Sequence, residues 1–154
     1  MMTSIIRFLN IILVALLAGT SFGIWIGFNP MNYSASTYIE QQQHLVASLQ
    51  TMLVSLVIIA TLLTIASAFL QRKNRNNFIA LIFAALFLLS CIFITRLGNL
   101  PIQKEMLTWS ANYFPENWTT LRDKWWTFHV MRTIAELIAL VLVAWTSFQK
   151  QLIK

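Results

Sequence analysis

Long runs of hydrophobic residues alternate with shorter polar segments along this chain. The runs cover about residues 5–28, 45–70, 78–95 and 128–148. A helix needs about 20 predominantly apolar residues to cross the hydrocarbon core of a bilayer, and each run has close to that length. The pattern therefore predicts an all-α fold, an integral membrane four-helix bundle that forms a single domain over residues 1–154.

The longest connection, residues 96–127, is expected to form a helical, aromatic-rich loop between the third and fourth membrane helices. A helix is predicted for Ile102 to Tyr113, after Pro101, and a second short helix is expected to begin near Asn117. Aromatic side chains gather at the headgroup level of membranes, so we expect most of those in this loop to cap the bundle there. They are Trp109, Tyr113, Phe114, Trp118, Trp125 and Trp126.

Composition supports a membrane protein and argues against several other classes. Charged residues make up only 10% of the chain and hydrophobic residues 58%, whereas a soluble domain has about 25% charged residues. The formal net charge is +6, but the basic residues mostly flank the apolar runs, so we expect a lipid bilayer as partner and no nucleic acid. The single cysteine, Cys91, lies inside an apolar run, which argues against thiol redox chemistry.

The distribution of basic residues predicts the orientation of the helices. The short segment "QRKNRNN" between the second and third runs carries Arg72, Lys73 and Arg75, and such clusters face the cytoplasm. The chain is therefore predicted to be a multi-pass protein of the cell membrane whose N- and C-termini are both cytoplasmic. The loops at residues 29–44 and 96–127 are expected to emerge together on the other side.

The first run carries Gly19, Gly23 and Gly27 at four-residue spacing. This small-xxx-small pattern predicts a face on which another helix packs closely, and a homo-oligomer is one arrangement that it allows. The run is also longer than the roughly 7–15-residue apolar core of a signal peptide. We therefore expect a retained membrane helix rather than a cleaved leader.

Polar residues form one stripe on each of two predicted helices. With about 100° between successive residues, the first stripe (Trp125, His129, Arg132 and Glu136) falls within a sector of about 60°. The second stripe comprises Glu40, His44, Ser48, Thr51 and Ser55. Ionisable residues inside a membrane normally face the bundle interior, so the two stripes are predicted to face each other around a polar pocket in the outer half of the bundle. The alternative is a structural cluster in which Arg132 and Glu136 neutralise each other.

Metal binding and nucleophilic catalysis receive little support from the sequence. Glu40, His44, His129 and Glu136 would offer two carboxylates and two imidazoles to iron, copper or zinc, and the two histidines would suit a haem. No HxxxH or HxH pair occurs, however, and neither does a GxSxG, CxxC or glycine-rich phosphate loop. No metal and no cofactor are therefore predicted.

Three segments resemble a known family. They are "GTSFGIWIGFNP", "GNLPIQKEMLTW" and "RDKWWTFHVMRT", in this order along the chain. Together they resemble the DUF1772 family, four-helix membrane proteins grouped with the fungal anthrone oxygenases. The chain differs from the family pattern at Gln103, where asparagine is frequent, and at His129, where asparagine is also frequent.

The resemblance implies an oxygenase that acts on a lipophilic phenolic ring without a cofactor. In this interpretation His129 removes a proton from the substrate, while Arg132 and Asn99 stabilise the developing oxyanion. Trp109 and Trp125 are expected to stack on the aromatic ring. The acidic and imidazole groups of the two stripes are expected to complete the binding site: Glu40, His44 and Glu136. A second hypothesis is a non-enzymatic membrane protein that binds a lipophilic small molecule or a partner helix.

Overall fold

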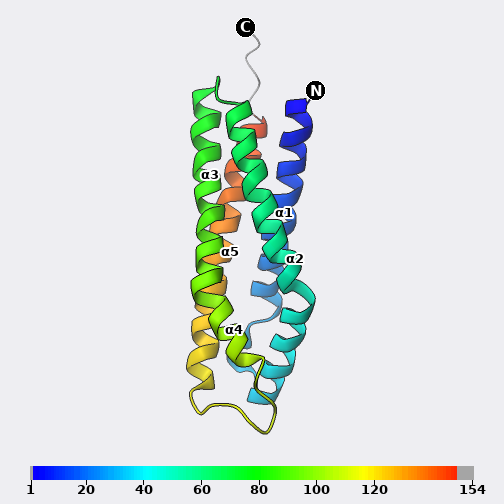
Figure 1. The fold of residues 1–154 in the computed structure, drawn as a ribbon, viewed down its shortest axis with the longest axis vertical. Coiled ribbons are helices and arrows are strands. Elements are labelled where there is room, and N and C mark those ends of the chain that lie inside the picture. Colours follow the sequence, from blue (N-terminus) through cyan, green and yellow to red (C-terminus); the bar gives the residue numbers. More distant parts are fainter. Residues whose placement is uncertain (1, 149–154) are drawn as a thin grey trace.

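Four long helices run up and down in the computed structural model, which describes residues 2–148 (Figure 1). Over this range the structure is helical with no strand, so the predicted all-α bundle is confirmed. The long helices are α1 (Met2–Gly27), α2 (Ala35–Leu70), α3 (Arg75–Ile94) and α5 (Trp118–Phe148). The shorter elements are the 3₁₀ turn η1 (Pro30–Asn32), the π-helical turn η2 (Thr95–Asn99) and α4 (Leu100–Met106).

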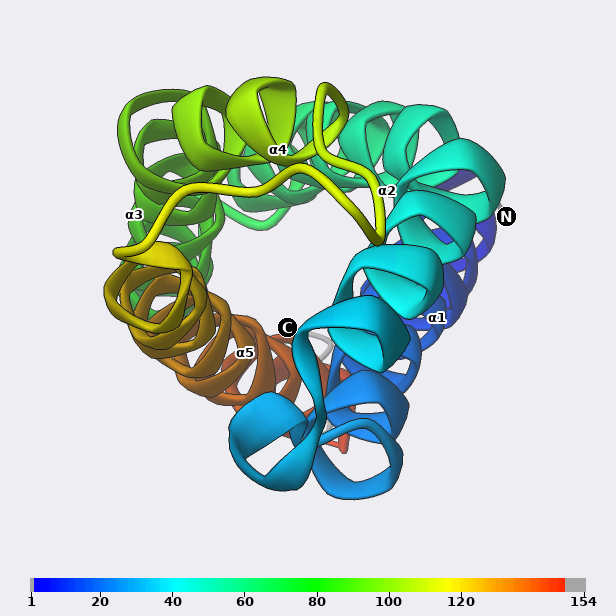
Figure 2. The same cartoon turned by 90° about the horizontal axis from the view of Figure 1, so that it is seen from below.

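The four long helices form a closed ring. Helix α1 packs against α2, α2 against α3, α3 against α5, and α5 against α1. Figure 2 shows this ring along the bundle axis, with α4 between α2 and α3. The start of α1, the turn between α2 and α3, and the end of α5 all lie at one end of the bundle, which we call the terminal end (Figure 1). The loop at residues 107–117 and η1 lie at the opposite, loop end.

All four long helical segments are long and apolar enough to cross a membrane. Helix α2 has 36 residues, which is about 54 Å and much more than the roughly 30 Å of the hydrocarbon core. It begins at Ala35 rather than near 45, and α5 begins at Trp118 rather than near 128. The apolar pattern marked only the membrane-embedded parts. The polar extension of α2 stays helical and is capped by Ser34, whose Oγ accepts from the Thr37 amide at 3.3 Å.

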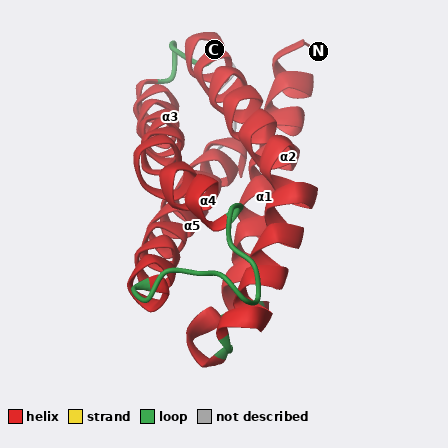
Figure 3. Cartoon of the chain, turned by 60° about the horizontal axis from the view of Figure 1, so that its bottom comes forward, coloured by secondary structure: helices red, strands yellow, loops and turns green. Residues whose placement is uncertain are grey.

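The third membrane helix continues beyond its predicted end. Helix α3 passes through the π-helical turn directly into α4, which contains Pro101. A proline in a continuing helix lacks its amide hydrogen and clashes with the carbonyl four residues earlier, and a local π-turn can relieve both problems. The helix expected from Ile102 to Tyr113 is correct only as far as Met106, because residues 107–117 form the loop shown in green in Figure 3.

Gly98 in the π-helical turn allows α5 to approach closely. A Cβ at this position would lie 2.7 Å from the ring of Phe128. By contrast, Gly19, Gly23 and Gly27 are exposed, and a Cβ at any of them would meet no described atom within 4 Å. The prediction that a helix packs on this glycine face is therefore wrong within the described chain.

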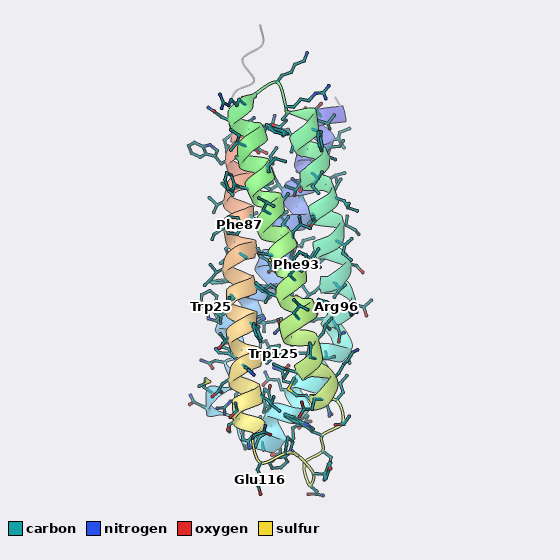
Figure 4. The ribbon with its side chains drawn as sticks, turned by 60° about the vertical axis from the view of Figure 1, so that its left-hand side comes forward. Trp25, Phe87, Phe93, Arg96, Glu116 and Trp125 are labelled. Atoms are coloured by element: carbon teal, nitrogen blue, oxygen red, sulfur yellow. The ribbon has the colours of Figure 1, made fainter. Side chains whose placement is uncertain are left out.

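Aromatic residues close the loop end of the bundle. Tyr38, Trp109 and Trp125 are buried there in one apolar cluster. In Figure 4, Trp125 lies on α5 further into the bundle than Glu116, which marks the tip of the loop. Trp109 and Trp125 therefore pack against their own chain and are not exposed to lipid, while their depth in a membrane stays a prediction. Tyr113, which is 76% exposed, remains free to contact lipid headgroups.

Candidate functional site

The polar stripe of α5 faces the inside of the bundle. Trp125 is 5% exposed, His129 is fully buried, and Glu136 is 1% exposed. The side chain of Arg132 is 13% exposed. These four large side chains, three of which are ionisable, therefore lie among the helices and do not face lipid. The inward orientation agrees with what the cost of charge in lipid requires.

Aromatic stacking fixes the imidazole of His129. Its ring lies parallel to that of Trp125, with 5.3 Å between the centroids and 2° between the planes. Trp126 stacks on it as well, at 5.5 Å and 28°. These contacts follow from helical spacing, since Trp125 and Trp126 precede His129 by four and three residues. The ring is thus held in one orientation before any ligand arrives.

Arg132 connects the polar groups of this region. Its Nη2 lies 3.3 Å from His129 Nδ1, and its Nη1 donates to Thr95 Oγ1 at 3.3 Å. A guanidinium has donors only, so Nδ1 must accept and the neutral imidazole carries its hydrogen on Nε2. The free electron pair of His129 is therefore on Nδ1, directed at Arg132. Its Nε2 has no hydrogen-bond partner among the described residues.

Glu136 forms an ion pair with Arg132 deeper in the bundle. Its Oε1 lies 3.5 Å from Arg132 Nε, and neither carboxylate oxygen has a hydrogen-bond partner among the described residues. A small cavity adjoins it, lined in part by Cys91, Thr95, Arg132 and Glu136, with space of about 10 Å³ for the centre of a water molecule. This space suits roughly one water, which would satisfy the carboxylate.

A larger pocket lies between α2 on one side and η2, α4 and α5 on the other. The pocket and its mouth hold about 450 Å³ of empty space, of which the centre of a water molecule reaches about 40 Å³. That inner part has room for roughly three waters. The wall is mostly aliphatic, with polar groups at a few points. It is formed by Ile24, Gln42, Leu45, Val46, Leu49, Gln50, Leu53, Val54, Thr95, Leu100, Gln103, Trp125, His129 and Arg132.

The predicted stripe on α2 does not contribute to this pocket. Glu40 and His44 are exposed, as are Ser48, Thr51 and Ser55. The expectation that these residues face the α5 stripe is therefore wrong. Glu40 and His44 lie in the part of α2 that extends beyond the hydrocarbon core, where polar residues are tolerated on every side of the helix. The inward face is on the opposite side of α2, about 200° around the helix from this stripe, and it places Gln42 and Gln50 in the pocket wall.

Two further predicted site residues lie behind the pocket and not in its wall. Asn99 is buried and its Nδ2 donates to the carbonyl of Trp125 at 3.1 Å. Trp109 is buried in the aromatic cluster of the loop end, and its carbonyl accepts from Gln43 Nε2 at 3.0 Å. Both residues therefore hold the elements that carry the pocket. Neither residue lines the pocket, so this placement does not favour direct contact with a substrate.

The four residues considered as metal ligands are not brought together. His44 and Glu40 are exposed on α2, whereas His129 and Glu136 are buried on α5. Within residues 2–148 no group of three or more histidine, cysteine or acidic side chains is placed to hold a metal ion. The groups that the site offers for chemistry are therefore one imidazole, one guanidinium, one carboxylate and several amides.

The sequence reasoning missed the glutamines of the pocket wall, Gln42 and Gln50. The signal that was available is residue type: Gln50 is a long amide within the apolar part of α2, and it lies on the same side as Gln42, Val46 and Leu53, which are buried. Gln103 was noticed as a departure from the family pattern, and it does line the pocket. An amide needs both a donor and an acceptor partner, so it is harder to place against lipid than a serine or threonine.

These features define a class of protein: a membrane-compatible four-helix bundle with a polar and aromatic pocket near one end, built around a buried histidine and arginine. The comparison with protein families shows to which family the chain belongs. The family model described as anthrone oxygenase matches residues 43–142, from α2 to α5, and the chain belongs to this family. No curated protein and no solved structure matched the chain.

Proposed function

We propose that the protein is a membrane oxygenase that converts an activated CH₂ group of a lipophilic phenolic substrate, such as an anthrone, into a ketone. The observation that carries this proposal is the pair of His129 and Arg132 in the pocket wall, with 3.3 Å between His129 Nδ1 and Arg132 Nη2. A base and a fixed positive charge then lie next to the same space. Removing a proton from carbon needs both, because the product is an anion.

The first step is proton transfer. Arg132 turns from His129 toward the carbonyl oxygen of the substrate. This oxygen is conjugated through the aromatic ring with the carbon that loses the proton. This movement frees the electron pair of Nδ1, which accepts the proton as the carbon–hydrogen bond breaks. The negative charge spreads onto the oxygen, where the guanidinium stabilises it. Stacking of Trp125 and Trp126 keeps the imidazole in place during the transfer.

The second step is reaction with oxygen. The carbanion donates electrons to O₂, a carbon–oxygen bond forms, and the resulting peroxide anion takes up the proton from His129 to give a hydroperoxide. Loss of water then leaves the ketone, so that R₂CH₂ and O₂ become R₂C=O and H₂O. The substrate supplies the electrons, and the proposed reaction uses no bound cofactor. The aliphatic part of the wall, including Leu45, Val46 and Leu49, suits an apolar ring and an apolar gas.

The remaining candidate residues act through others in this proposal. Asn99 positions Trp125, and Trp109 supports the aromatic cluster. Glu136 orients Arg132 through the ion pair at 3.5 Å. Glu40 and His44 have no role, because both are exposed on the outer part of α2.

A second candidate function is binding of a lipophilic molecule without turnover. The interaction of Arg132 with Nδ1 favours it, because an imidazole held in this way is not free to act as a base. The inner space of about 40 Å³ for water centres does not separate the two functions, because a fused aromatic ring requires the pocket to widen in either case.

Oxygen uptake separates the two functions. Purified protein is incubated with anthrone, and oxygen consumption is measured above the spontaneous oxidation of anthrone. We expect His129→Gln to lower the protein-dependent rate by about a hundredfold or more. His44→Gln is the matched control, since the exposed histidine should be dispensable. Unfolding temperatures of both variants establish that they are folded. If His129→Gln keeps the wild-type rate, the proposed mechanism is wrong, and if wild type shows none, binding without turnover stands.

The proposal includes a location and an orientation. The protein is placed in the cell membrane with both termini cytoplasmic and the pocket in the outer half. Supporting this, Arg72, Lys73 and Arg75 lie at the turn between α2 and α3, and Arg7 lies near the start of α1. Both elements are at the terminal end (Figure 1), and no acidic residue lies there within the described chain. At the loop end, basic and acidic residues are mixed. Assembly into a homo-oligomer through the exposed glycine face of α1 remains a prediction.

A further inference from the structure

Gln42 is a buried amide in the wall of the pocket. It lies on the inward face of α2 and is 4% exposed. Its Oε1 has no hydrogen-bond partner anywhere in the described part of the chain. A buried acceptor without a donor is destabilising, so a group that lies outside the protein chain is expected to complete it.

The neighbouring glutamines show that this is particular to Gln42. The adjacent Gln43 uses its Nε2 to hold the loop end, through the carbonyl of Trp109 at 3.0 Å. Gln41 is half-buried and does not line the pocket. Of these three consecutive glutamines, Gln42 is therefore the one that is both buried and directed at the pocket. It also lies just outside the residues that match the family, so nothing in that match assigns it a role.

The chemistry of an amide oxygen limits what it recognises. It accepts a hydrogen bond from a hydroxyl or an N–H, and it discriminates against an ether or a carboxylate, which offer no hydrogen. The other side of the pocket carries Arg132, which is a donor only. A ligand that satisfies both sides has an oxygen acceptor near Arg132 and a hydroxyl donor near Gln42, on an otherwise apolar body that suits the aliphatic wall.

We infer that Gln42 contacts the substrate directly and selects hydroxylated rings, by accepting a hydrogen bond from a substrate hydroxyl at Oε1. This inference rests on the proposed function, in that it takes the pocket as the substrate site. Without substrate, this acceptor has no partner among the described residues. The selectivity comes from the substrate hydroxyl, since a site built to bond a hydroxyl rejects an analogue that lacks it.

The test measures binding with two probes that the protein cannot turn over. 2-Hydroxyanthraquinone carries the donor, and 2-methoxyanthraquinone replaces it with an ether. Both absorb tryptophan emission, and Trp125 lies in the pocket wall, so quenching of fluorescence of the full chain in detergent reports binding. The variant is Gln42→Met, which keeps the length of the side chain and removes the amide. Gln41→Met is the matched control on the same helix.

We expect Gln42→Met to weaken binding of the hydroxyl probe about tenfold and that of the methoxy probe less than about twofold. Gln41→Met should change neither. Equal weakening of both probes, no weakening of either, or no binding to wild type would overturn the inference. Oxygen uptake is measured separately, so a protein that discriminates the probes but consumes no oxygen contradicts the oxygenase and leaves the role of Gln42 intact.

Discussion

Removal of the positive charge at Arg132 should destabilise the bundle strongly. Arg132→Met leaves Glu136, at 1% exposure, without its only charged neighbour among the described residues. Breaking a buried ion pair by removing one partner costs about 3–5 kcal/mol, because the other charge stays buried and uncompensated. For a chain of this length about 1 kcal/mol lowers the unfolding temperature by roughly 2–4 °C, so a decrease of about 6–20 °C is expected.

Removal of the negative charge at Glu136 should destabilise the bundle much less. Glu136→Gln removes a carboxylate whose oxygens make no hydrogen bond within the described residues. Arg132 keeps Thr95 and His129 as partners and is the more exposed of the two. We expect a loss of about 1 kcal/mol. In the double variant the unpaired charge is gone, so its stability should lie well above that of Arg132→Met alone.

Thermal unfolding in detergent, followed by circular dichroism, measures all three variants. Asp123→Asn is the control, since Asp123 pairs with Arg122 at 2.8 Å but its side chain is 47% exposed. An exposed pair of this kind contributes about 0–1 kcal/mol. The reasoning is refuted if Arg132→Met and Glu136→Gln lower the unfolding temperature equally and their effects add, or if Asp123→Asn costs as much as Arg132→Met.

Three further predictions concern packing and topology. Gly98→Ala should cost about 1–3 kcal/mol of stability in the same assay, because its Cβ would lie 2.7 Å from the Phe128 ring. Phe128→Leu should restore part of this loss. If Gly98→Ala causes no loss, the close approach of α5 is contradicted. Gly23→Ala should leave the unfolding temperature of the monomer unchanged or raise it, since no described atom lies within 4 Å, and a decrease would show that the face is packed. A cysteine in place of Lys73 should react with a membrane-impermeant maleimide only from the cytoplasmic side, while the buried Cys91 stays unreactive; labelling from outside would reverse the proposed orientation.

The side of α5 that faces the bundle interior could be predicted from sequence, because the membrane environment determines it. His129, Arg132 and Glu136 lie on one helical face within the apolar part of α5, and lipid offers no partner for a guanidinium or a carboxylate. The bundle interior is then the only low-energy direction, and the structure has all three side chains inside. What periodicity did not reveal is that Arg132 contacts His129 Nδ1, because that depends on rotamers.

The side of α2 that faces the bundle interior could not be predicted in the same way. The polar positions Glu40 and His44 lie in the helical extension outside the hydrocarbon core, where a charge has no preferred side. Within the apolar part, Thr51 and Ser55 are exposed, and short hydroxyl side chains tolerate this because they can bond to the carbonyls of their own helix. Gln50, with a longer amide, is the residue of that segment that turns to the pocket. Residue type, rather than spacing alone, carried the information.

The orientation of α4 depends on the π-helical turn before it, which the sequence did not predict. A continuous α-helix through Pro101 would put the residues after it on another face. The π-helical turn at Thr95–Asn99 shifts the phase and directs Gln103 into the pocket wall. Gly98 and Pro101 were visible in the sequence, but the glycine becomes informative only once Phe128 lies against it.

The central claim is that the ligand binds beside His129, inside the bundle, and the two histidines of the chain allow it to be tested directly. Protein labelled with ¹⁵N in histidine alone gives imidazole signals from His44 and His129, which His44→Gln assigns. On addition of 2-hydroxyanthraquinone, we predict that the signals of the buried His129 shift while those of the exposed His44 stay in place. Shifts confined to His44, or no shift of either residue at saturating ligand, would contradict the account.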